Sequence, residues 1–153
     1  MAAATETDIA PFQVAKDAPQ LVKKGKTSAQ LVRAGNLGIG VQVAAGSAGE
    51  TNLHSHPNAD SCWMVLGGRA IFYTTNDKVI AELGKFEMVS IPAGTPYWFD
   101  TADKREEGAE NLVVLHITSR VPGVTTGRID YTPRDVGGDN RISDMIEGKF
   151  FEG

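Results

Sequence analysis

Residues 49–68 read GETNLHSHPNADSCWMVLGG, and this stretch decides the fold that the sequence predicts. His54 and His56 lie two residues apart in an alternating segment, 51–56, which is typical of a β-strand. Side chains two residues apart on a strand point to one face, so both imidazoles should project to the same side of a sheet. The next apolar run, 61–66, ends at a Gly-Gly pair and predicts a second strand with a turn after it.

A second stretch, residues 84–99, reads GKFEMVSIPAGTPYWF. It predicts a strand over 86–91, a turn forced by the Pro-Ala-Gly-Thr-Pro sequence, and another strand over 97–100. Other short apolar runs predict strands at 37–44, 70–74, 79–83 and 112–117. The Asn76-Asp77 pair should join two of these strands as a hairpin. Many short strands separated by turns indicate an all-β domain.

Length and composition indicate one domain with a core of its own. The chain has 153 residues, of which 41% are hydrophobic and 22% charged. A formal net charge of −4 gives no reason to expect nucleic acid as a partner. Cys62 is the single cysteine, so no disulfide forms within the chain, and we expect a cytoplasmic protein. We expect no membrane segment, because no run approaches ~20 apolar residues.

Taken together, the two stretches resemble the paired motifs of the cupin superfamily. The family's first motif is a glycine, a His-x-His pair, a glutamate and a closing glycine, and residues 49–67 match all of it but the glutamate. The second is a glycine, then Pro-x-Gly, then a histidine, and residues 84–97 match all of it but the histidine. The resemblance implies an all-β, cupin-type jelly-roll β-barrel with the active site inside, often in a homodimer. Members include dioxygenases, isomerases, lyases and plain binding proteins, so the fold alone does not choose the chemistry.

The strand pattern and the resemblance together predict three parts in the chain. Residues 1–20 form an N-terminal arm, and residues 21–118 form the cupin barrel. Residues 119–153 form a C-terminal extension, with a short helix at 142–146, that packs on the barrel or on a dimer partner. A loose tail is the alternative.

Two positions depart from the family's pattern. The glutamate position, five residues after His56, holds Ser61. The histidine position, three residues after Gly94, holds Tyr97. Only His54 and His56 therefore carry over as metal ligands, and the family's four-ligand set is incomplete.

Two imidazoles on one face can chelate a divalent ion, for which we expect Fe, Zn, Ni or Mn. No carboxylate offsets the charge of the ion, so it would need further ligands. Tyr97 is one candidate. His116 is another candidate if Leu112, Val114 and His116 face inward. If the odd-numbered residues of this strand face inward instead, His116 lies outside the barrel. The alternative is that His54 and His56 are ordinary hydrogen-bonded histidines and that no metal is bound.

Tyr97 also has an acid–base interpretation, because a phenol beside a substrate can transfer a proton or stabilise an oxyanion. Trp63 shares the phase of Ser61 and should project into the barrel. Ser61, Trp63, Phe72 and Phe99 are therefore candidates for lining a substrate pocket. Ordinary core packing is the alternative for the aromatic side chains.

These residues favour a small-molecule enzyme in which Tyr97, His54 and His56 are catalytic. The substrate would be small and aromatic or carbonyl-containing, and the reaction that of a dioxygenase, lyase, isomerase or cyclase. One alternative is a metal-free cupin that binds a ligand or serves as the non-catalytic subunit of a larger cupin enzyme. Another is a metal-free enzyme that uses His54, His56 and Tyr97 as acid–base groups. By the same resemblance we expect a homodimer.

Overall fold

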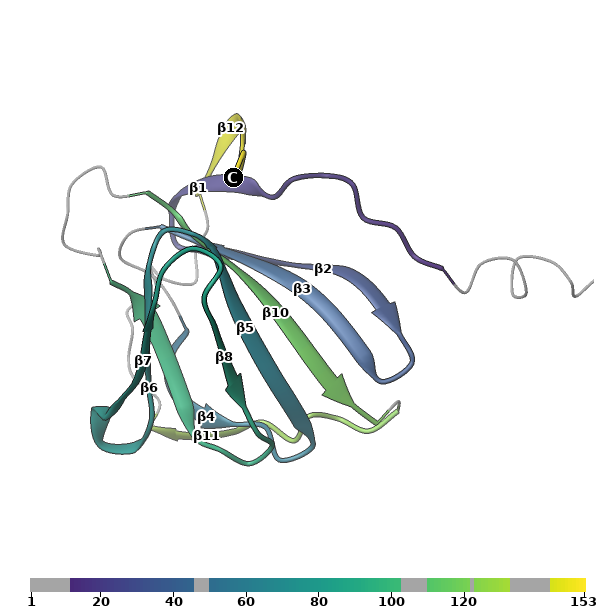
Figure 1. The fold of residues 1–153 in the computed structure, drawn as a ribbon, viewed down its shortest axis with the longest axis vertical. Coiled ribbons are helices and arrows are strands. Elements are labelled where there is room, and N and C mark those ends of the chain that lie inside the picture. The colour runs from purple at the N-terminus through teal and green to yellow at the C-terminus, as the bar shows by residue number, and fades with distance from the viewer. Residues whose placement is uncertain (1–11, 46–49, 103–109, 122, 133–143) are drawn as a thin grey trace, which may run out of the picture.

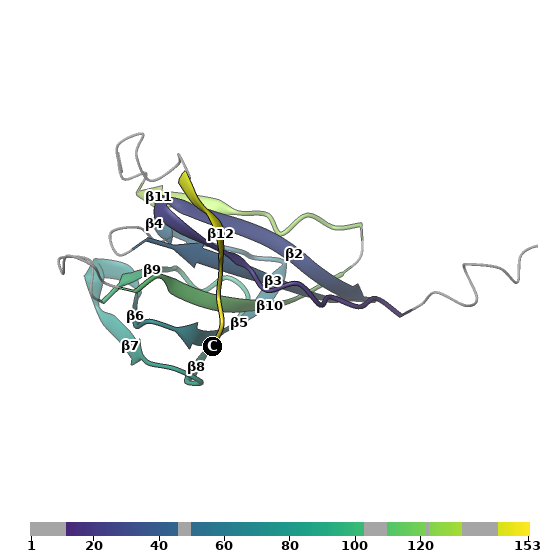
Figure 2. The same ribbon diagram turned by 90° about the horizontal axis from the view of Figure 1, so that it is seen from above.

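The computed structural model describes residues 12–45, 50–102, 110–121, 123–132 and 144–153. These residues form two five-stranded antiparallel sheets and a separate two-stranded ribbon (Figures 1 and 2). In the described part of the chain, no helix has the length and apolar character needed to cross a membrane.

The first sheet carries most of the cavity described below. Its strands are β2 (Lys26–Ala34), β3 (Leu37–Ala44), β10 (Leu112–Arg120), β5 (Ala59–Gly67) and β8 (Met88–Ile91), in that spatial order. The central strand, β10, pairs with β3 on one side and with β5 on the other. Segments that are far apart in the sequence therefore lie side by side.

The second sheet carries His54, and His56 follows directly after one of its strands. Its strands are β11 (Ile129–Thr132), β4 (Glu50–Ser55), β9 (Tyr97–Thr101), β6 (Ala70–Tyr73) and β7 (Val79–Leu83), in that spatial order. The hairpin between β6 and β7 turns at Asn76 and Asp77, both at positive φ, a conformation that short polar side chains tolerate.

The predicted strands are confirmed: eight of their sixteen ends coincide with the structure, seven are shifted by one or two residues, and the last strand runs three residues further. The sequence did not predict β1 (Gln20–Lys24), β2, β11 or β12 (Asp144–Phe150). The helix expected at 142–146 is wrong for residues 144–146, which lie in β12; positions 142 and 143 fall outside the described residues. A helix so short gains few hydrogen bonds of its own, whereas pairing with β1 satisfies the backbone of this segment.

Two hydrophobic cores form on the two faces of the first sheet. The inner core lies between the two sheets and includes Trp63, Phe72 and Phe99. The outer core contains Val43 and Val113, and the ribbon of β1 and β12 covers it. Phe151 also packs against the outer core. Its ring lies close to Gly67, and a Cβ added to that glycine would be only 2.6 Å from the ring.

Gly68 and Gly94 provide a matched test of this packing. Both have positive φ, +74° and +81°, which disfavours any other residue. A Cβ at Gly68 would lie 2.9 Å from the carbonyl oxygen of Asn111, whereas a Cβ at Gly94 meets nothing within 4 Å. We expect Gly68→Ala to lower the free energy of unfolding by about 2–3 kcal/mol and Gly94→Ala by about 1 kcal/mol. Urea unfolding of both variants measures the difference, and equal losses would contradict the close approach of β10 at Gly68.

Candidate functional site

Three aromatic rings from neighbouring strands converge inside the barrel. His54 lies on β4, His56 follows the end of that strand, and Tyr97 opens β9 directly opposite His54. The ring centroid of His54 is 4.5 Å from that of Tyr97 and 4.9 Å from that of His56, and the centroids of His56 and Tyr97 are 6.3 Å apart. His54 and Tyr97 are 1% and 2% exposed, whereas His56 is half-buried.

A hydrogen bond to the backbone determines the proton position on His54. Its Nδ1 lies 2.7 Å from the carbonyl oxygen of Asn52, two residues earlier on β4. A carbonyl oxygen only accepts, so the bond requires the proton on Nδ1. In the neutral imidazole, Nε2 then carries the lone pair, which makes this nitrogen the basic one.

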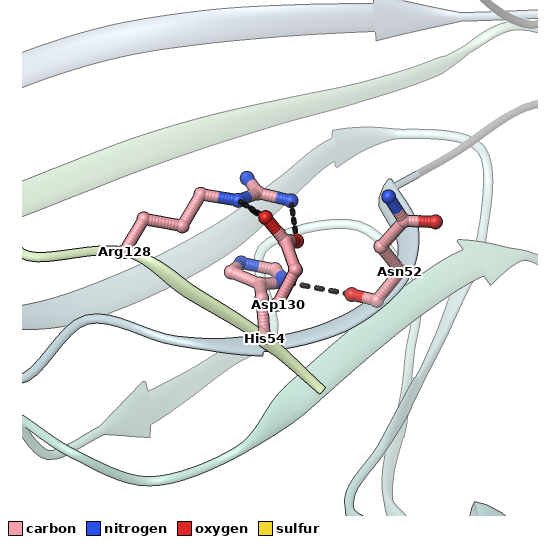
Figure 3. A network of polar contacts seen from close by, with 4 residues as sticks. All are labelled: Asn52, His54, Arg128 and Asp130. Atoms are coloured by element: carbon pink, nitrogen blue, oxygen red, sulfur yellow. Dashed lines mark hydrogen bonds and ion pairs between the residues drawn. The ribbon is translucent and has the colours of Figure 1, made fainter. Parts of the chain in front are cut away.

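The C-terminal extension contributes a strand to this site. Strand β11 pairs with β4 so that Asp130 stands opposite His54 (Figure 3). The guanidinium of Arg128 donates to the Asp130 carboxylate, with Nη2 2.9 Å from Oδ1, and compensates its charge. A second contact, 2.8 Å between Ser55 Oγ and the Tyr131 hydroxyl, ties the two strands together. Asp130 was not predicted from the sequence, because only the register of β11 brings it opposite His54.

His116 faces the interior, which settles the phase that the sequence left open. Its ring is stacked on Trp63 of the next strand, with centroids 3.8 Å apart and planes 4° apart. Its Nε2 lies 3.0 Å from Ser61 Oγ and 3.1 Å from Thr118 Oγ1. The Nε2 atom of His116 is therefore hydrogen-bonded to two hydroxyl groups.

A cavity of about 270 Å³ opens along the inner face of the first sheet. His56, Ser61, His116 and Thr118 line it, together with Gln42. The cavity therefore reaches one member of the three-ring cluster, His56, with His54 next to it.

The aromatic side chains proposed from the sequence to line the pocket occupy a different place. Trp63, Phe72 and Phe99 are at most 1% exposed and pack against one another in the inner core, below the cavity. Ser61 is the member of that proposed set that reaches the cavity wall. The indole Nε1 of Trp63 is buried and has no hydrogen-bond partner among the described residues.

The donors that surround His54 do not fit the four-ligand metal site of the family. Nowhere in the described ranges do three His, Cys, Asp or Glu side chains gather in a way that could hold an ion. Ser61 replaces the carboxylate, and the nearby carboxylate of Asp130 is already paired with Arg128. Two neutral imidazoles and a phenol remain, with no negative charge to offset a divalent cation.

This donor set predicts weak metal binding. After loading with Zn²⁺, Ni²⁺, Fe²⁺ or Mn²⁺ and extensive dialysis, we expect the protein to retain far less than one ion per chain, as measured by elemental analysis. His54→Ala serves as the comparison, because it removes one of the two imidazoles. One ion per chain in the parent protein, lost in His54→Ala, would show that the phenol or a ligand outside the described residues completes a site.

Comparison with solved structures assigns the fold. The first of three neighbours is a Klebsiella pneumoniae protein with a double-stranded β-helix domain (TM-score 0.56, 16% identity, 78% of this chain and 91% of that chain covered). The second is an RmlC-like cupin from Desulfovibrio desulfuricans (TM-score 0.50, 21% identity, 62% and 82% covered). The third is the DMSP lyase DddQ from Ruegeria pomeroyi (TM-score 0.56, 21% identity, 72% and 53% covered).

The chain has the cupin, or double-stranded β-helix, fold. No family model matches the sequence, and no curated protein matches it either. At these identities the likeness is one of fold, so the chemistry has to be argued from the site itself.

Proposed function

We propose that this protein is a small-molecule enzyme that transfers a proton to or from its substrate. The observation that carries the proposal is the placement of His56, which lines the cavity while His54 and Tyr97 lie directly behind it. Imidazole is the side chain whose ordinary pKa lies nearest to neutral pH, which suits it to general acid–base catalysis.

Each member of the cluster has a distinct part in the proposed reaction. His56 meets the substrate in the cavity and takes or gives the proton. His54 is held with its own proton on Nδ1, so its Nε2 carries the lone pair inside the cluster. Tyr97 contributes a buried phenol that can relay a proton or donate a hydrogen bond to an oxyanion.

The volume and the lining of the cavity limit the size and the chemical class of the substrate. The cavity volume, about 270 Å³, lies just below the ~300–1,000 Å³ that is usual for ligand pockets. Ser61, Thr118 and His116 give the wall hydroxyl and imidazole groups that suit a carbonyl oxygen. We infer a small carbonyl compound with an acidic C–H bond, and lyase or isomerase chemistry. A DMSP lyase among the structural neighbours supports the choice of lyase chemistry.

Exchange of substrate hydrogen for deuterium tests the proposal without knowledge of the product. Pyruvate, 2-oxobutanoate, acetoacetate and acetone are incubated with the protein in D₂O, and loss of the C–H signals next to the carbonyl is followed by proton NMR. We expect catalysed exchange with at least one compound. We expect His56→Ala to slow it by ~10²–10⁴-fold, the usual contribution of a general acid or base.

Two controls sharpen this experiment. Tyr97→Phe should slow exchange, whereas Tyr73→Phe should not, because Tyr73 is stacked on Trp98 with centroids 4.0 Å apart and does not line the cavity. EDTA should leave the rate unchanged. Exchange that survives both His56→Ala and Tyr97→Phe would refute the assignment. Binding of these compounds without exchange would favour a cupin that binds its ligand and does no chemistry.

A further inference from the structure

We propose that the substrate is a small organic anion and that Arg33 and Arg120 bind its carboxylate or phosphate group at the mouth of the cavity. The inference extends the proposed function, since it takes the ligand of the cavity to be the substrate. It depends on four features of the first sheet.

The first feature is a gradient of polarity along β10. Its inward positions begin with Leu112 and Val114, which are 1% exposed and belong to the inner core. His116 and Thr118 follow at the cavity wall, and Arg120 ends the strand. The inward side chains of β10 therefore change from apolar in the inner core to polar and then cationic along the cavity.

The second feature is a β-bulge in β2, which turns Arg33 inward. Gln30 pairs with Gly40 of β3, but the next pairs join Val32 to Ile39 and Arg33 to Gly38. Without the irregularity between Gln30 and Val32, simple alternation would place Val32 inside and Arg33 outside. The structure shows the reverse, and Arg33 lines the cavity.

The third feature is a set of contacts that keeps the bulge and leaves space for the guanidinium. The side-chain amide of Gln30 donates from Nε2 to the carbonyl oxygens of Val32 and Ile39, at 2.9 and 2.8 Å, and so spans the irregular pair. Opposite, Gly38 has no side chain. A Cβ built there would lie 4.0 Å from Arg33 Nη1, so the guanidinium lies over this glycine.

The fourth feature is the charge at the mouth. No Asp or Glu of the described residues lines the cavity. Two other arginines, Arg69 and Arg128, pair with carboxylates, whereas Arg33 and Arg120 form no ion pair within the described part of the chain. Both also border an adjoining hollow with Gly35 and Gly123, so the mouth opens outward past them. In a chain of net charge −4, this placement favours an anion.

Binding of three matched probes tests the proposal. Benzoate, phenyl phosphate and benzamide share a ring and differ in the charge of the substituent, and NMR titration of the backbone amides of residues 116–120 reports their affinities. We expect at least one anion to bind about tenfold more tightly than benzamide, the scale of one charge-assisted hydrogen bond. The ratio of benzoate to phenyl phosphate shows whether the arginines favour a carboxylate or a phosphate.

Three variants complete the experiment. Arg33→Gln and Arg120→Gln should each weaken binding of the anion by about tenfold and leave benzamide unchanged. Arg69→Gln, whose side chain pairs with Glu82 on β7, should bind like the parent protein. Benzamide binding as tightly as both anions, the two cavity variants matching the parent, or no binding by either anion would each overturn the proposal.

The outcome separates this inference from the proposed function. His56→Ala should still bind the anion while exchange is lost. Anion binding that depends on the arginines, in a protein without exchange activity, would support this site and refute the proton transfer. Exchange with acetone as fast as with the charged compounds, and unaffected in both arginine variants, would refute this inference alone.

Discussion

The alternation of side chains along β10 is the constraint on which the rest of the structure depends. The strand lies between β3 and β5, so each of its residues must point into the barrel or away from it. The inward set passes from Leu112 through His116 to Arg120 and so makes core, cavity wall and mouth in turn. The outward set begins with Val113 in the second core, below the ribbon. One strand thereby fixes the position of both cores relative to the site.

Much of the fold could be predicted because its central strands carry strong local patterns. The His-x-His pair and the Pro-Ala-Gly turn mark the strands that bring His54 to Tyr97, and the structure places these residues opposite each other. Strand β2 was missed because its composition, KTSAQLVRA, mixes polar and apolar residues at an edge of the sheet. Strand β12 was missed because its stability comes from pairing with β1, 120 or more residues away.

The site was less predictable, and for a related reason. Both faces of β10 are apolar near its start, since both are covered, so alternation could not decide whether His116 points inward. Asp130 reaches His54 through the register of β11, which the local sequence does not encode. The aromatic residues were expected at the pocket wall, but Trp63 is covered by the His116 ring and lies in the core. The sequence pattern predicts which residues share a face of a strand. The pairing of distant strands then determines which of those residues line the cavity.

The bulge in β2 lets the length of this strand change at one point without changing which side chains reach the cavity. Leu31 is the extra residue between the pairs Gln30–Gly40 and Val32–Ile39, and its side chain packs against the outer core. Deleting Leu31 would leave plain alternation through Gln30, Val32 and Arg33, so Val32 would still point away from the barrel and Arg33 into it. Such a deletion would cost packing in the outer core and leave the cationic entrance in place.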